Sequence, residues 1–149
     1  MSSSREIKLA ELKRVQKLLH GVNYEVFFHL YGPGDPDASL DETLAALLSE
    51  KSKVAGVYPS SPQKAISRIM KMVLHQGGIG YGPLQLDTNE KEIIERMTRV
   101  FDRIGLKSAD VVSEFAFKEG NPTSPVFWDF AYDIHSNRQR WILVGASCD

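Results

Sequence analysis

The sequence is poor in the features that mark secreted and membrane-spanning proteins. A single cysteine, Cys148, stands among the 149 residues, and one thiol can form neither an internal disulfide nor a cysteine-rich zinc site. This cysteine usage fits a reducing compartment. No stretch approaches the roughly 18 consecutive apolar residues of a membrane span, and the first residues lack the apolar core of a secretory signal. We therefore expect a cytoplasmic protein that does not bind membranes.

An excess of charge is also missing, since 18 basic and 19 acidic side chains give a net charge of −1. Chains that bind nucleic acid through their overall field are usually strongly basic, so such a function would need a local basic surface. The 42% apolar and 25% charged residues are typical of a globular protein. Because the length is the commonest size of one domain, we predict that residues 1–149 form a single domain.

No segment matches a catalytic, cofactor or metal-binding signature closely enough to assign a reaction. The segment 35–41 places oxygen-bearing side chains at alternate positions, as calcium loops do. It has Leu40 where such a loop needs glycine, and Ala46 where a bidentate glutamate belongs. The sequence therefore predicts no metal and no cofactor, and it favours a protein that is not an enzyme.

Four segments carry apolar residues at the spacing of an amphipathic helix, and we predict helices over residues 4–20, 40–48, 62–76 and 87–104. Two of them begin with the spacing of a capping box, Ser3 with Glu6 and Ser39 with Glu42. Residues 51–59, which separate the second and third helices, are predicted to form a turn region.

Four other segments are rich in aromatic and β-branched residues or alternate in polarity, and we predict strands over residues 24–31, 111–118, 127–135 and 139–146. The last two are joined by a tight turn placed at Ser136 and Asn137. The order α-β-α-α-α-β-β-β, with the helices mostly before the strands, predicts an α+β fold. We expect a four-stranded antiparallel sheet with the helices packed on one face.

The predicted C-terminal hairpin has two different faces. The turn position places Asp133 opposite Arg140 and Tyr132 opposite Trp141. One face is aromatic and is assigned to the core; it carries Trp128, Phe130, Tyr132, Ile134, Trp141 and Leu143.

The other face of the hairpin is mixed, and it carries Asp129, Asp133 and His135 beside Arg140. Cross-strand pairs of aspartate and arginine stabilise sheets modestly, so one interpretation is structural. Another is a face that binds a ligand or a partner strand. A third is a metal or acid–base cluster, because the three side chains at alternate positions point the same way.

Two further segments are candidates for binding. The glycine-rich loop 77–83 is either a connector or a flexible lid over a cleft, with Tyr81 as the contact residue. The third helix places Lys64, Arg68 and Lys71 at positions i, i+4 and i+7 on one face. That basic face is either solvated or able to bind phosphates or an acidic partner.

Three functions remain open on these grounds. The leading hypothesis is a small cytosolic, non-enzymatic binding or regulatory module that acts through a protein partner or by self-association as a homodimer. The alternative is a small-ligand binder or enzyme with a cleft between the C-terminal sheet and the loop 77–83. The third is a nucleic-acid-associated factor that uses Lys64, Arg68 and Lys71.

Overall fold

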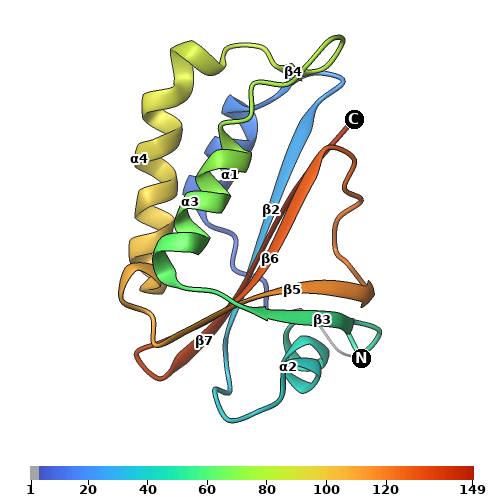
Figure 1. Ribbon diagram of the computed structural model, residues 1–149, viewed down its shortest axis with the longest axis vertical. Coiled ribbons are helices and arrows are strands. Elements are labelled where there is room, and N and C mark those ends of the chain that lie inside the picture. Colours follow the sequence, from blue (N-terminus) through green and yellow to red (C-terminus); the bar gives the residue numbers. More distant parts are fainter. Residues whose placement is uncertain (1–3) are drawn as a thin grey trace.

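A computed structural model describes residues 4–149, which form an α+β fold as predicted (Figure 1). The helices are α1 (Ala10–Leu18), α2 (Leu40–Leu47), α3 (Pro62–Val73) and α4 (Leu86–Ile104), followed by the short 3-10 helix η1 (Leu106–Ser108). The strands are β1 (Gly21–Val22), β2 (Glu25–Gly34), β3 (Lys53–Pro59), β4 (Gly82–Pro83), β5 (Val111–Glu119), β6 (Trp128–Ser136) and β7 (Gln139–Cys148). Among these residues, no helix is both long enough and apolar enough to cross a membrane.

The main sheet has five strands in the order β2-β7-β6-β5-β3, so the prediction of four strands was wrong. All neighbours are antiparallel, and β1 and β4 form a separate two-stranded ribbon. The missed strand is β3, which was predicted as a turn region. It lies at the outer edge of the sheet and is mostly exposed, so it lacks the strong alternation of a half-buried strand.

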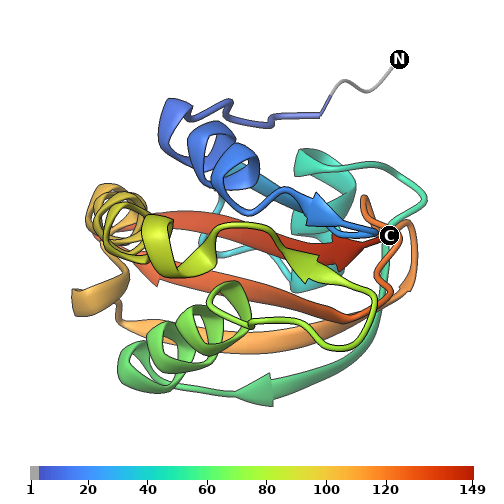
Figure 2. The same cartoon turned by 90° about the horizontal axis from the view of Figure 1, so that it is seen from above.

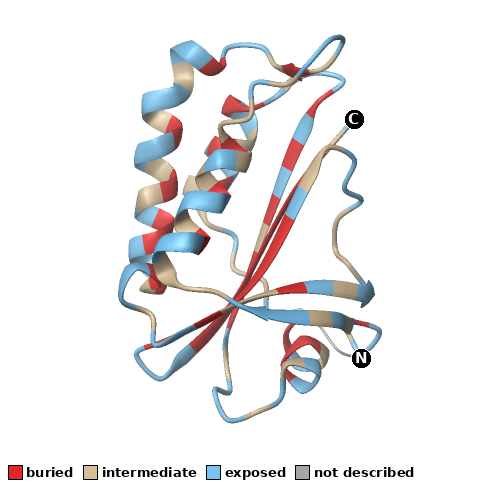
Figure 3. Cartoon of the chain, viewed as in Figure 1, coloured by how far each residue is buried: buried red, intermediate tan, exposed pale blue. Residues whose placement is uncertain are grey.

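Helices cover both faces of the sheet, so the prediction that they share one face was also wrong. Val15 of α1, Ile69 of α3 and Met97 of α4 are fully buried in one core against the first face. Leu44 of α2 is buried in a second core on the opposite face, together with strand residues such as Ile142. In Figure 2, α1 lies beside β2 at one end of the strand order, and α3 lies beside β5 and β3 at the other end. Figure 3 shows buried residues concentrated on the central strands and on the inner sides of the helices.

The outer edge of β2 is closed by the first described residues of the chain. Ile7 N–H donates to the Leu30 carbonyl at 2.7 Å, and Gly32 N–H donates to the Arg5 carbonyl at 3.2 Å. The side chain of Gln16 accepts from Phe28 N–H at 2.8 Å. The first helix is therefore shorter than the predicted 4–20, because this segment satisfies the main chain of an edge strand. Ser3 of the predicted capping box lies outside the described residues.

The β6–β7 hairpin turns one residue later than predicted. Asn137 and Arg138 form its two-residue turn with φ of 52° and 62°, as the type I′ turn of a tight hairpin requires. The partners Ser136 with Gln139 and His135 with Arg140 follow, so the predicted pairing of Asp133 with Arg140 was wrong by two residues. A shift of two keeps each side chain on its predicted face, and the aromatic face indeed forms part of the first core.

Candidate functional site

Strands β5 and β6 form a fork, because they remain paired for only part of their length. Their pairs run from Val111 with His135 to Glu114 with Tyr132. Beyond that point, in the part of the chain that the structure describes, β5 continues along β3 and β6 pairs with β7 alone. Figure 1 shows the two strands diverging toward the long loop that joins them.

Main-chain groups of β6 point into this fork. Asp110 N–H donates to the His135 carbonyl at 2.8 Å, so the main chain of His135 faces β5. Alternate residues of an antiparallel strand share that direction, which turns the N–H and C=O groups of Ala131 and Asp129 toward the gap. Ala131 is only 5% exposed, and no described strand pairs with it on this side. Buried main-chain groups are normally hydrogen-bonded, so the fork is suited to receive another extended chain.

A pocket of about 370 Å³ occupies the fork. Its volume lies in the range of roughly 300–1,000 Å³ that is usual for ligand sites. Its walls come from α3, β3, β5, β6, β7 and the loop between β5 and β6, and comprise Tyr58, Arg68, Glu114, Phe115, Ala116, Phe117, Asn121, Pro125, Asp129, Phe130, Ala131 and Val144. Because residues of both sheet faces contribute, the pocket extends between the strands and does not lie on one face alone.

The cationic face of α3 forms one rim of this pocket. Arg68 lines the pocket and also two shallower hollows along the helix, one with Lys64 and Lys71 and one with Lys71 and His75. Arg68 Nε lies 3.1 Å from Glu114 Oε1, whereas within residues 4–149 neither lysine has an ion-pair partner. We call the pocket and the two hollows together the fork groove.

Aromatic side chains close the end of the fork groove beyond Trp128. The rings of Tyr81 and Phe127 are stacked, with centroids 4.0 Å apart and planes at 2°. His75 Nε2 lies 3.3 Å from the Tyr81 hydroxyl, and Trp128 Nε1 donates to the Tyr24 hydroxyl at 2.8 Å. Tyr81 therefore holds the loop 77–83, predicted as either a connector or a flexible lid, against the end of the sheet.

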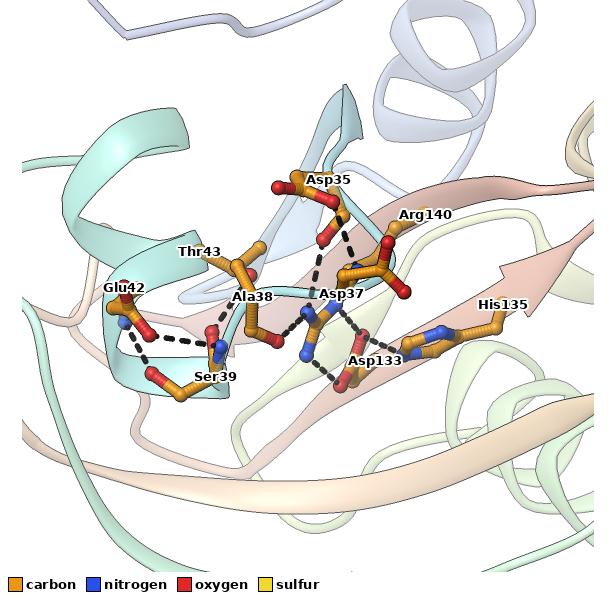
Figure 4. Close-up of polar contacts among 9 residues, drawn as sticks. All are labelled: Asp35, Asp37, Ala38, Ser39, Glu42, Thr43, Asp133, His135 and Arg140. Atoms are coloured by element: carbon orange, nitrogen blue, oxygen red, sulfur yellow. Dashed lines mark hydrogen bonds and ion pairs between the residues drawn. The ribbon is translucent and has the colours of Figure 1, made fainter.

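Asp133, His135 and Arg140 form a second polar cluster, on the sheet face that α2 covers (Figure 4). Arg140 donates to Asp133 through Nε at 2.9 Å and through Nη2 at 2.8 Å. Arg140 Nη1 also donates to the carbonyls of Ala38, at 2.6 Å, and Asp35, at 3.2 Å. His135 Nε2 lies 3.4 Å from the same carboxylate. These contacts attach the loop before α2 to the sheet.

This second cluster has the properties of a structural tie. The side chains of Asp133 and Arg140 are only 7% and 4% exposed, and a buried bidentate pair of this kind requires its remaining polar atoms to be bonded. Arg140 meets that requirement through the two carbonyls. The carboxylate of Asp133 is therefore engaged by protein groups and is shielded from a ligand.

The predicted hairpin set is thus divided between two places. Asp133, His135 and Arg140 lie together beneath the loop 35–38, whereas Asp129 is exposed and lines the fork groove. Asp129 and Asp133 stand four residues apart on one strand, roughly 13 Å. Residues 4–149 contain no group of three or more histidine, cysteine, aspartate or glutamate side chains placed to hold a metal ion.

Several residues of the fork groove were not predicted. Tyr58 comes from β3, which the sequence did not reveal as a strand, and Glu114 and Asn121 were not singled out. The loop 120–127 offered one signal, because it contains Pro122 and Pro125. A connection of that length and composition does not favour a tightly paired hairpin.

The buried residue Tyr132 makes the free energy of unfolding depend on pH in the alkaline range. Burial raises the pKa of Tyr132 to about 12; the nearby Glu114 carboxylate adds to the rise and Arg68 opposes it. Between pH 10 and 12 the unfolded chain loses this phenolic proton while the folded chain keeps it, so the free energy of unfolding falls as pH rises.

Tyr132→Phe should reduce this alkaline loss of stability by on the order of 2 kcal/mol at pH 12. The measurement is urea unfolding of both proteins at several pH values from 8 to 12. Part of the loss should remain in the variant, because burial also raises the pKa of Tyr24 and of Tyr31. If the free energy of unfolding fell equally with pH in both proteins, Tyr132 would not contribute to the alkaline loss of stability.

The chain matches no known protein family, no curated protein and no solved structure. A function for it must therefore be argued from the arrangement of its own residues.

Proposed function

We propose that this chain is a small cytosolic, non-enzymatic binding module that acts through a protein partner, and that the partner binds in the fork groove. The observation that carries the proposal is the early separation of β5 from β6 after Glu114 and Tyr132. On the side of β6 that faces β5, no strand of residues 4–149 pairs with Asp129 or Ala131, which lie at the edge of a pocket of about 370 Å³. Unpaired strand edges are common sites for the docking of another chain.

The side chains around the groove also support binding rather than catalysis. General acid–base chemistry needs a titratable group within hydrogen-bond reach of a substrate. In this chain Asp133 is engaged by Arg140 beneath α2, and Glu114 is paired with Arg68 at the rim of the groove. Asp129 lines the groove at an exposed position of β6. The groove instead offers main-chain edges, cations and exposed aromatic surface such as Tyr58, which is 59% exposed.

The proposal can be tested by site-specific photo-crosslinking in the cells that produce the protein. A benzoylphenylalanine placed at Asn121, which lines the groove, should crosslink to one protein species. The matched control carries the same group at Lys91, an exposed position on α4 away from the groove, and should give no such product. The captured protein is then purified and titrated into the unlabelled chain by calorimetry.

A variant that fills the groove connects the crosslink to binding. Asn121→Trp should weaken the affinity for the captured protein by at least tenfold, whereas Lys91→Trp should leave it unchanged. Crosslinking from Lys91 but not from Asn121 would place the partner elsewhere and contradict the proposal. An absence of protein crosslinks at Asn121 would contradict it as well.

A further inference from the structure

We infer that the fork groove takes an extended acidic segment of its partner, which adds to β6 as a strand between β6 and β5. The inference rests on the proposed function and specifies the chemistry of the partner. Its first support is geometric, since an added strand forms main-chain hydrogen bonds with an unpaired edge. Asp129 and Ala131 present such an edge, and Phe115 of β5 lines the opposite wall of the same pocket.

The second support is the balance of charge around the groove. On the α3 side, Arg68 lines the pocket, and Lys64 and Lys71 line the adjoining hollows that share Arg68 with it. Two carboxylates line the pocket, Glu114, which is paired with Arg68 at 3.1 Å, and the exposed Asp129 on the opposite face of β6. Cations therefore outnumber carboxylates along this wall, and a negatively charged segment is the complementary occupant.

The two walls also predict the pattern of the segment. Successive side chains of an extended strand point to opposite faces of a sheet. Those on the α3 face would meet Arg68 and its neighbouring lysines, whereas those on the α2 face would meet buried apolar residues such as Phe115, Ala131 and Val144. The occupant should therefore alternate glutamate or aspartate with small apolar residues over about four to six positions, the length of a typical strand.

A selection from random twelve-residue peptides displayed on phage, with the full chain as target, tests this inference. Selected peptides should be acidic and should alternate charged with apolar residues. In hydrogen-exchange NMR the synthetic peptide should slow exchange of the amides of Asp129 and Ala131. The amide of Lys91 on α4 serves as the remote control and should be unaffected.

Two pairs of variants separate main-chain pairing from charge. Asp129→Pro removes an N–H that faces the fork, a position where a strand tolerates proline, and should weaken peptide binding by at least tenfold. Asp129→Ala keeps that N–H and should bind the peptide as well as the original chain or better. Lys64→Glu with Lys71→Glu should weaken binding at least tenfold, whereas Lys91→Glu should not.

A variation of the peptide makes the test independent of how well a variant folds. N-methylation at alternate positions blocks the bonds to one side of an added strand, so one of the two methylated registers should abolish binding while the other retains most of it. Equal effects of both registers would overturn strand addition. Selected peptides that are basic or uncharged would overturn the acidic occupant.

Two further outcomes distinguish this inference from the proposed function. If a protein crosslinks at Asn121 but its binding does not depend on Lys64 and Lys71, the partner site stands and the acidic strand is wrong. If single-stranded oligonucleotides displace the peptide at nanomolar concentration while no protein crosslinks at Asn121, both proposals fail in favour of a nucleic-acid function.

Discussion

Arg140→Met is expected to lower the free energy of unfolding by about 3–5 kcal/mol. The substitution leaves the Asp133 carboxylate buried without its two charge-assisted hydrogen bonds, which measure 2.9 and 2.8 Å. It also removes the donors to the carbonyls of Asp35 and Ala38, so the loop before α2 loses its attachment to the sheet. Urea unfolding followed by circular dichroism measures the effect.

The matched control replaces both charges at once. Asp133→Leu combined with Arg140→Met leaves no isolated buried charge, and apolar replacement of a buried ion pair is often close to neutral. The double variant should therefore be more stable than Arg140→Met alone, although the bonds to the loop 35–38 are lost in both. If the double variant were less stable than Arg140→Met, the side chains of the pair would contribute more to stability than is lost by leaving one carboxylate buried and unpaired.

Phe130→Ala should lower the free energy of unfolding by about 3–5 kcal/mol, the usual range for a buried phenylalanine. Phe130 is 2% exposed and stacks on Trp128 with ring centroids 6.1 Å apart. Its ring also packs over Gly145 of β7, where a Cβ would overlap the ring and would lie 3.0 Å from Phe28. Thermal and urea unfolding would measure the loss.

Gly145 supplies the control for this second substitution. Gly145→Ala alone should cost about 1–3 kcal/mol, because the new methyl group overpacks the space held by the ring of Phe130. In the Phe130→Ala background the same methyl group enters the cavity, so the double variant should lose at least about 1 kcal/mol less than the sum of the single losses. Strict additivity would show that the two residues do not share this space.

The central strands could be predicted because burial imposes a visible pattern on them. β6 and β7 face a core on each side, and their aromatic and aliphatic residues alternate accordingly. β3 gave no comparable pattern: it contains Gly56 and Pro59, and Val57 and Tyr58 remain 50% and 59% exposed. An outer strand of this kind is stabilised by pairing with β5 more than by burial. Main-chain pairing imposes little pattern on the polarity of the side chains, so it is hard to predict from one sequence.

The exact register of the hairpin could not be predicted from the sequence for a different reason. Its turn requires positive φ at both central residues, and Arg138 adopts 62° although arginine rarely does so. No glycine marked the position. The prediction of which side chains share each face of the hairpin was still correct, because a shift of two residues preserves the face of each side chain.

The candidate site itself was predicted only in part. Arg68, Lys64, Lys71 and Asp129 were chosen from spacing and charge, and all four line the fork groove. The fork was not foreseen, because it depends on where two neighbouring strands stop pairing. That point is set by the path of β5 toward β3 and by the loop 120–127, which are properties of the folded chain.

The closed edge of β2 limits how copies of this protein could join their sheets. Ile7 and Gln16 already bond the outer main chain of β2 at Leu30 and Phe28, whereas among the described residues β3 pairs only with β5. Two molecules that join outer edge to outer edge must therefore both use β3. Such a contact is isologous and occupies the open edge of each molecule. The assembly therefore stops at a dimer, because no open outer edge remains from which a fibre could grow.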